Sequence, residues 1–472
     1  MPRSVGHPLF LRVGQGMEKS SQWYNTSIFT GTADKAKRSL TNRLMARSSR
    51  VDRRYSTLLA SADLSVRNLS PQRAKAEYAV TCMLYVLLGL AVIGLISSTV
   101  FTGMVLAAVP GYLRERRQAL RQLEERFTPP LSLLKPVHGD EPGLEAHLAT
   151  FFEQDYPQYE ILFCARREDD AGLETARRVA RRYPRIPARF LVTGGHPDYI
   201  NDKVASLEKM EAVAAHEILV ISDSDVRVGP DYLRAVALSF ADERVGAMCC
   251  PYRGVAVNGG LWARLEAVGM SVEMTSGVLA ARVMEGMRFV LGPTMAFRRS
   301  VIRRIGSFGI AAGYCADDFI YGNETYKLGE KVVLSHHAID HMVINPGFVA
   351  SMKHQARWMR STRFSRPKGH FGTALTFSIP FGLLAWGAAA ALGQPVWGLA
   401  LLGWSVATRL ALAIAVGRLV VRDSSWFGLL VLYPVRDLMG FGFWAASYLS
   451  SRVLWRGQVY ELLPGGRMRA AG

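Results

Sequence analysis

Residues 79–109 are the feature that most constrains this chain, because they carry no charged side chain over 31 consecutive positions. A helix needs about 20 apolar residues to cross the hydrocarbon core of a bilayer. A fully buried helix of this length would be unusual in a soluble protein. The sequence therefore predicts a transmembrane helix over residues 79–110.

Three further apolar segments lie towards the C-terminus, at residues 373–392, 396–416 and 426–449. The first two have the length of membrane spans, although Arg409 interrupts the second and must therefore face protein or reach the membrane surface. The third is interrupted by the sequence YPVRD, which leaves a re-entrant or interfacial pair of helices as an alternative to a span. We predict two or three membrane segments over residues 371–450.

Basic side chains are concentrated in two places. Residues 1–78 hold 14 Lys and Arg against 5 Asp and Glu, and this excess of positive charge is half of the chain's net charge of +18. This segment lacks sustained apolar periodicity, so we expect a disordered or loosely helical extension. No RNA- or DNA-binding motif accompanies it, and we expect no nucleic acid partner. The second cluster, SMKHQARWMRSTRFSRPKGHFG, directly precedes the first C-terminal apolar segment.

Between the apolar segments, short apolar runs alternate with helical periodicity. We expect strands at residues 131–134, 159–165, 188–192, 217–222, 245–252, 289–297 and 331–339. The alternation predicts an α/β domain with a mostly parallel sheet, whose ligands bind beyond the carboxyl ends of the strands. The predicted organisation is an extension (1–78), a transmembrane helix (79–110), a basic linker (111–128), the α/β domain (129–370), the membrane segments (371–450) and a basic tail (451–472).

The strand expected at residues 217–222 ends in two carboxylates, Asp223 and Asp225. Two carboxylates at an exposed strand end can hold a hard cation, and Mg²⁺ usually takes one or two protein carboxylates together with substrate phosphates. The structural alternative is a helix cap before Pro230. The position at a strand end favours a divalent metal, Mg or Mn, and with it a diphosphate substrate.

Several motifs occur in the order and spacing of a known family: LSLLKPVHGDEPGLEAHLATFFEQDYPQYEILFC, ISDSDVRVGPDYL, LGPTMAFRRSVIRRIGSF, ADDFIYG and HQARWMRSTRFSRPKG. Over about residues 129–369 the chain resembles the ceramide glucosyltransferase family, glycosyltransferase family 21, and within it the bacterial hopanoid-biosynthesis-associated glycosyltransferases. The resemblance extends loosely through LLVLYPVRDLMGFGFWAASYLSSRVLWRG. In this family Asp223 and Asp225 match the metal-binding Asp-x-Asp motif, with Asp225 as the better direct ligand.

The resemblance implies a GT-A type domain, a UDP-sugar donor and inverting transfer to a lipid hydroxyl. A hopanoid polyol is the favoured acceptor, and a ceramide-like lipid comes next. The resemblance also implies an integral protein of a bacterial inner membrane with a cytoplasmic catalytic domain. The basic residues beside the predicted spans agree only in part, since those before residue 79 favour the opposite orientation.

On the donor side, the resemblance assigns three residues. Asp170 matches the family's first aspartate, which contacts the uracil, and Glu168 and Asp169 are alternatives in the same acidic trio. Asn201 and Lys203 match an Asn-x-Lys motif near the donor, where a helix N-terminus offers backbone N–H groups to phosphate. A solvated loop and an ordinary helix start are the structural alternatives.

On the acceptor side, the resemblance makes Asp318 the catalytic base and Asp317 its supporting neighbour. The structural alternative is a pair of helix caps. His354, Arg357 and Trp358 match the family's motif ending in Arg-Trp, and at this spacing they share one helix face. Arg357 is expected to neutralise diphosphate charge and Trp358 to lie near the acceptor, although a membrane-surface helix would use the same residues.

Other functions remain open at this point. A processive polysaccharide synthase shares the Asp-x-Asp and Arg-Trp motifs but commonly needs more spans, and transfer to a polyprenyl phosphate is a second enzyme alternative. A basic, non-catalytic membrane scaffold would leave the four aspartates unexplained. The histidines lack the spacing of a zinc site and are expected to be structural or acceptor-side residues: His138, His336, His337 and His341.

Overall fold

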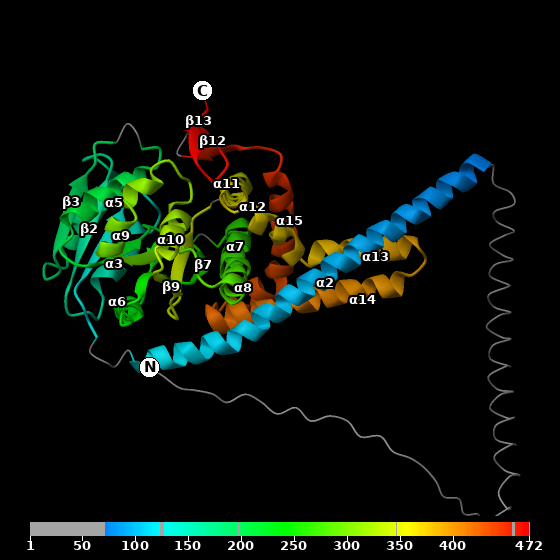
Figure 1. The fold of residues 1–472 in the computed structure, drawn as a ribbon, viewed down its shortest axis with the longest axis horizontal. Coiled ribbons are helices and arrows are strands. Elements are labelled where there is room, and N and C mark those ends of the chain that lie inside the picture. Colours follow the sequence, from blue (N-terminus) through cyan, green and yellow to red (C-terminus); the bar gives the residue numbers. More distant parts are fainter. Residues whose placement is uncertain are drawn as a thin grey trace, which may run out of the picture. The chain divides into compact units, whose positions relative to one another are not determined.

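The computed structural model describes residues 71–122, 127–195, 199–257, 259–345, 347–455 and 458–471. The predicted extension therefore lies outside the described residues, except for residues 71–78, which begin a helix. An α/β domain and a group of long apolar helices make up the described chain (Figure 1).

A seven-stranded sheet of order β3-β2-β1-β4-β8-β6-β9 forms the centre of the α/β domain (Figure 1). Its strands are β1 (Leu131–Pro136), β2 (Tyr159–Ala165), β3 (Ala188–Val192), β4 (Ile218–Ser222), β6 (Val245–Cys249), β8 (Thr294–Arg298) and β9 (Lys331–Leu334). The first four run parallel, and β8 runs antiparallel between β4 and β6. The predicted α/β class with a mostly parallel sheet is confirmed.

Two of the predicted strands are each divided in two. The run at 245–252 becomes β6 and β7 (Tyr252–Ala256), because Pro251 between them has no N–H for the ladder. The run at 331–339 becomes β9 and β10 (Ile339–Val343). With the short β5 (Val226–Arg227), the new strands build a second sheet of order β5-β10-β7. This sheet brings β10 beside the segment that carries Asp225.

Helices connect the strands and cover the sheet (Figure 1). They are α3 (Leu144–Phe152), α4 (Ala171–Ala180), α5 (Asp202–Val213), α6 (Tyr232–Ser239), α7 (Leu261–Val268), η1 (Gly269–Met274), α8 (Thr275–Glu285), α9 (Arg299–Arg304), η2 (Phe308–Ala311), α10 (Asp317–Lys327), α11 (Phe348–Ser365) and α12 (Pro367–Thr373). Their apolar faces join the strands in one hydrophobic core, to which α3 contributes Leu148 and Phe151.

The apolar segments form α2 (Pro71–Gln122), η3 (Ala374–Thr376), α13 (Ile379–Ala391), α14 (Pro395–Leu412), η4 (Ala413–Val420), η5 (Gly428–Leu432) and α15 (Tyr433–Ser447). Within the described ranges, three helices are long and apolar enough to cross a membrane. A fourth span is present if the segment Pro367–Thr376 and helix α13, which meet at a bend of 51°, cross together. The uncharged run lies inside α2, where Ile93, Ile96 and Val100 are exposed as lipid-facing residues would be.

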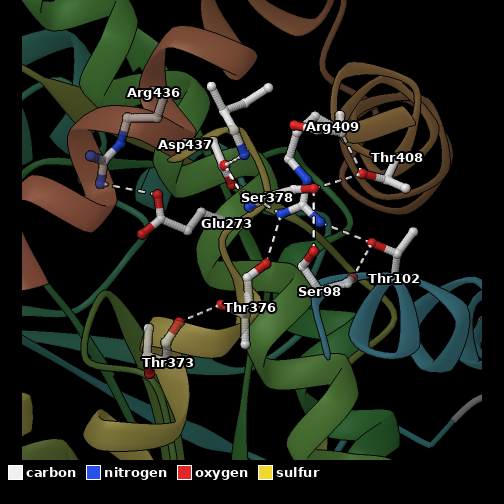
Figure 2. A network of polar contacts seen from close by, with 12 residues as sticks. Ser98, Thr102, Glu273, Thr373, Thr376, Ser378, Thr408, Arg409, Arg436 and Asp437 are labelled. Carbon is white, nitrogen blue, oxygen red and sulfur yellow. Dashed lines mark hydrogen bonds and ion pairs between the residues drawn. The ribbon is translucent and has the colours of Figure 1, made fainter. Parts of the chain in front are cut away.

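The ion pair of Arg409 and Asp437 hydrogen-bonds to free backbone groups at this bend (Figure 2). Asp437 of α15 accepts hydrogen bonds from the backbone N–H groups of Ser378 and Ile379, at 2.9 and 2.8 Å, where α13 begins. Arg409 of α14 donates to Asp437 at 2.9 Å and to the carbonyl oxygen of Thr376 at 3.0 Å. Both charged residues are 2% exposed, so Arg409 faces protein, as its position in an apolar segment required.

Within the segment expected to be a basic tail, 451–472, the described residues form a three-stranded antiparallel sheet. Its strands are β11 (Arg452–Trp455), β12 (Gln458–Leu462) and β13 (Met468–Ala470). Its apolar face packs against Cys315 and Phe364, and the N–H of Met468 donates to the carbonyl oxygen of Gly313 at 2.7 Å. The sheet therefore supports the segment that leads into α10.

Candidate active site

A buried lysine lies at the carboxyl end of β1. Lys135 has no exposed surface, and its ammonium group donates to the backbone oxygen of Asp223 at 2.6 Å. Burial lowers the pKa of Lys135 to about 7, although the negative charges of Asp223 and Asp225 oppose this shift. Lys135 thereby fixes the start of the Asp-x-Asp segment. Sequence reasoning missed this residue, although a lysine inside the apolar run LSLLKPV was a usable signal.

Lys203 joins two of the predicted carboxylates. Its ammonium nitrogen lies 2.6 Å from Asp223 Oδ1 and 3.7 Å from Asp317 Oδ2. Burial opposes the charge of Lys203, but the two carboxylates outweigh burial and raise its pKa. Asn201 caps α5 by accepting from the N–H of Lys203 at 3.1 Å, and its amide donates to the carbonyl oxygen of Tyr314 at 3.1 Å. Asn201 therefore fixes the backbone at Lys203, where α5 begins.

Asp225 is paired with a histidine of β10. Its Oδ2 lies 3.2 Å from His341 Nε2, and its backbone oxygen accepts from the N–H of Met342 at 2.8 Å. Burial of Asp225 works against its charge, but His341 outweighs burial and lowers the pKa of Asp225 to about 2. The second carboxylate oxygen, Oδ1, is buried without a hydrogen-bond partner among the described residues.

Glu141 approaches the same place from the segment after β1. Burial, followed by the charge of Asp225, raises the pKa of Glu141 to about 7, and its Oε2 is also buried without a hydrogen-bond partner in the described part of the chain. Two such carboxylate oxygens fit a hard divalent cation. Within the described residues no three His, Cys, Asp or Glu side chains converge as a complete metal site, so substrate phosphates would have to supply further ligands.

Asp318 lies in the first turn of α10, directly after Asp317. Its two carboxylate oxygens accept hydrogen bonds from the N–H of Gly292 at 2.9 Å and from the N–H of Phe319 at 2.7 Å. Burial, with the neighbouring charge of Asp317, raises the pKa of Asp318 to about 6. A carboxylate held in one orientation with a pKa near neutrality is suited to general base catalysis.

The predicted residues of α11 lie close to the Asp225 pair. The ring of Trp358 lies 6.4 Å from that of His341 and 4.3 Å from that of His354. His354 Nδ1 lies 2.6 Å from Glu266, a carboxylate of α7 that is 1% exposed. Glu266 was missed, since nothing in its helical context marks it. Arg357 interacts with the thiol of Cys315, two residues before Asp317.

Asp170 stands apart from the Lys203 cluster. It caps α4 by accepting from the N–H of Gly172 at 2.9 Å, and it also accepts from the N–H of Gly139 at 3.0 Å. Of its alternatives, Asp169 pairs with Arg167 and Glu168 with Arg177, both on the surface. Asp170 is therefore the member of the trio that is tied to the segment after β1, which also carries Glu141.

The arrangement brings together an Asp-x-Asp pair after β4, a lysine that bridges two aspartates, and a buried aspartate of near-neutral pKa. These groups lie beyond the carboxyl ends of parallel strands, where nucleotides bind in open α/β sheets. Fold and site together define a glycosyltransferase domain of the GT-A type.

The sequence model described as Glycosyl transferase family 21 matches residues 67–468, so the chain belongs to this family. It is 22% identical to Ceramide glucosyltransferase 3 of Caenorhabditis elegans over 352 residues, which are 73% of this chain and 75% of the relative. It is 31% identical to the Ceramide glucosyltransferase of Komagataella phaffii over 150 residues, which are 30% of this chain and 29% of the relative. The predicted family and the predicted enzyme class, a glycosyltransferase, are confirmed.

Two solved structures are also similar. The mannosyltransferase PcManGT from Pyrobaculum calidifontis, in complex with GDP-Man and Mn²⁺, has a TM-score of 0.44 and 19% identity, covering 75% of this chain and 98% of the other. TarS 1-349 of S. aureus, in complex with UDP-GlcNAc, has a TM-score of 0.34 and 14% identity, covering 72% and 99%.

Proposed function

We propose that this protein transfers a hexosyl unit from a UDP-sugar to a hydroxyl group of a membrane lipid, with inversion at the anomeric carbon. The observation that carries the proposal is the Lys203 bridge between Asp223 and Asp317, beside a base of raised pKa. Family membership and the ceramide glucosyltransferase relatives support a lipid acceptor. The acceptor we favour is a hopanoid polyol, followed by a ceramide-like lipid.

The donor diphosphate is proposed to lie between Lys203 and Arg357. Lys203 is charged throughout the neutral range, because its raised pKa reflects two carboxylate neighbours. Asp223 and Asp225 would hold a Mg or Mn ion together with the donor phosphates, and the ion when bound would supply positive charge to the leaving diphosphate. Asp170, held by the Gly139 N–H, is proposed to contact the uracil.

The transfer itself needs one base. Asp318 accepts the proton of the lipid hydroxyl while the hydroxyl oxygen forms a bond to the anomeric carbon. The bond from that carbon to the diphosphate oxygen breaks in the same step, and UDP leaves with the bonding electron pair. A single displacement of this kind inverts the anomeric configuration. Trp358 and His354 are proposed to line the acceptor side, since they adjoin His341 and Glu266.

The setting that we propose is a bacterial inner membrane, with the α/β domain on the cytoplasmic side. The basic α11 immediately precedes α12 and the bent entry into α13, and basic residues beside membrane segments favour the cytoplasm. The domain limits 79–110, 129–370 and 371–450 remain our proposal for the division between membrane and water.

The proposal is tested by sugar transfer in membranes that contain the full chain. Each radiolabelled UDP-sugar is supplied with Mg²⁺ or Mn²⁺ and either a hopanoid polyol or ceramide, and labelled lipid is separated and counted. We expect one pair to give product, and we expect Asp318→Asn and Asp225→Asn to abolish it. The matched control is Asp155→Asn, a surface aspartate that pairs with Arg234, and this variant should retain full activity.

The anomeric configuration of the labelled lipid, determined by NMR, tests inversion separately. Retention of configuration would contradict the single displacement. Absence of both product and UDP binding, in protein with a normal melting transition, would favour the non-catalytic scaffold.

A further inference from the structure

A groove of about 650 Å³ lies between α11 and the C-terminal sheet. Its lining includes the basic side chains of Lys353, Arg357 and Arg360 from α11 and of Arg452 from β11. None of these four forms an ion pair with a carboxylate in the described part of the chain. Four cations that surround one groove without internal compensation repel each other, and an anion that enters the groove would relieve this repulsion.

Two details show that the basic groups of the groove lack acceptors within the described chain. Glu461 lies opposite Arg452 in the β11–β12 ladder, but it pairs with Arg469 at 2.6 Å. Arg360 donates one N–H to the carbonyl oxygen of Arg452 at 3.0 Å, while its Nε is buried without a hydrogen-bond partner among the described residues. The donors of the groove therefore exceed the acceptors that the described chain supplies.

The groove also has an apolar part. It is formed by Val453, Leu454, Trp455 and Val459 of β11 and β12, and Leu454 and Val459 are 51% and 43% exposed. Inorganic phosphate has no part that would cover these side chains, and a nucleotide would cover them only with its base. An amphiphile with an anionic head and an apolar body matches both the basic and the apolar residues of the lining.

The groove lies next to a membrane helix end. Helix α15 ends at Ser447, and Tyr448 and Leu449 follow, the latter 85% exposed. Arg363 of α11 donates to the carbonyl oxygen of Ser447 at 2.6 Å, which ties the two helices together. Aromatic residues such as Tyr448 mark the level of the lipid headgroups at the ends of membrane helices. A phospholipid could therefore reach Arg452 from the bilayer itself.

We propose that this groove binds an anionic phospholipid, with the headgroup phosphate among Lys353, Arg360 and Arg452 and the glycerol and upper chains against Leu454 and Val459. This lipid is distinct from the sugar acceptor, whose hydroxyl is neutral and needs no cluster of cations. Arg357 and His354 also line the groove, so a bound phospholipid borders the candidate active site.

The experiment is native mass spectrometry of the full chain, released from nanodiscs that contain equal amounts of phosphatidylglycerol and phosphatidylcholine. We expect the wild type to retain one phosphatidylglycerol in preference to phosphatidylcholine. Each charge removed by Lys353→Gln or Arg452→Gln should weaken this preference roughly five-fold, and the double variant about 25-fold. The matched control is Lys327→Gln, whose ammonium group pairs with Glu324 on α10 and does not line the groove.

Equal retention of both lipids by the wild type would overturn the proposal. So would an equal loss in Lys327→Gln, because the effect would then reflect total charge and not the groove. A titration of the same sample with UDP tests whether the groove binds the sugar donor and not a lipid. If UDP displaces the lipid, and if Arg452→Gln weakens UDP binding, the groove is part of the donor site and the lipid proposal fails. Unchanged melting temperatures show that the variants are folded.

Discussion

The ammonium group of Lys203 lies 2.6 Å from the carboxylate of Asp223, and the same group reaches Asp317 at 3.7 Å. The contact between Lys203 and Asp223 joins the N-terminus of α5 to the end of β4. The contact between Lys203 and Asp317 joins both to the start of α10. Three elements from distant parts of the sequence thus meet at one side chain, and this convergence determines what the following substitutions should do.

Lys203→Met should lower kcat/KM by about 100-fold or more, because it removes the cation that faces the developing diphosphate charge. It should also move the acidic limb of the pH–rate profile to higher pH, since Lys203 lowers the pKa of Asp318. Steady-state kinetics across pH measure both effects. Lys209→Met, an exposed position on the same helix, is the control, and equal losses in the two variants would contradict the assignment.

The activity of the wild type should rise with pH through about 6. A base must be deprotonated to act, and the shift of Asp318 from 3.8 to about 6 moves the point of half-maximal kcat/KM upward by the same amount. Asp318→Asn should remove the activity together with this limb. A profile that stays flat down to pH 5 would exclude Asp318 as the base.

His341→Gln should weaken Mn²⁺ binding in the presence of UDP by about 10- to 100-fold, as expected when a group that orients a metal-binding carboxylate is changed. The reason is that His341 fixes Asp225 through the 3.2 Å contact. Asp225→Asn should have the larger effect. Electron paramagnetic resonance of free Mn²⁺ gives the affinity directly, and Asp231→Asn serves as a control outside the cluster. If His341→Gln and Asp225→Asn both bound Mn²⁺ as tightly as the wild type, the proposed metal site at Asp225 would be contradicted.

Asp437→Leu should destabilise the apolar helices by about 3 kcal/mol or more, because it leaves Arg409 buried without its carboxylate and uncaps α13. The melting temperature in detergent, measured by intrinsic fluorescence, reports the loss. Ser98→Ala removes only one hydroxyl near the pair and should cost about 1 kcal/mol. If both substitutions cost the same, the ion pair adds nothing beyond an ordinary hydrogen bond.

The sequence was most informative where a strand is buried on both faces. The expected bounds of β2, which is buried along its whole length, match the structure, because continuous apolar runs in a parallel sheet are short and sharply ended. The expected bounds of the half-exposed edge strand β3 also match. The division at Pro251 was missed, since the apolar run continues across the proline. The strands of the C-terminal sheet were missed because their residues are mixed in polarity and their partners lie far away in sequence.

The candidate site was predictable as a set of motifs but not as a geometry. The meeting of Lys203, Asp223 and Asp317 depends on the end of one strand and the starts of two helices, and no local pattern gives their distances. Glu266 lies 88 positions before His354, so their contact follows only from the packing of α7 on α11. His341 was expected to be structural or acceptor-side, and its contact with Asp225 depends on the second sheet.

The bend before α13 has a consequence for how the protein is made. The residue that caps its N-terminus, Asp437, is synthesised 59 positions after Ser378. While the chain emerges from the ribosome, α13 and α14 are therefore made before the carboxylate that caps α13 and pairs with Arg409. The polar contacts of the bend are therefore complete only after α15 has been made and has packed against α13 and α14.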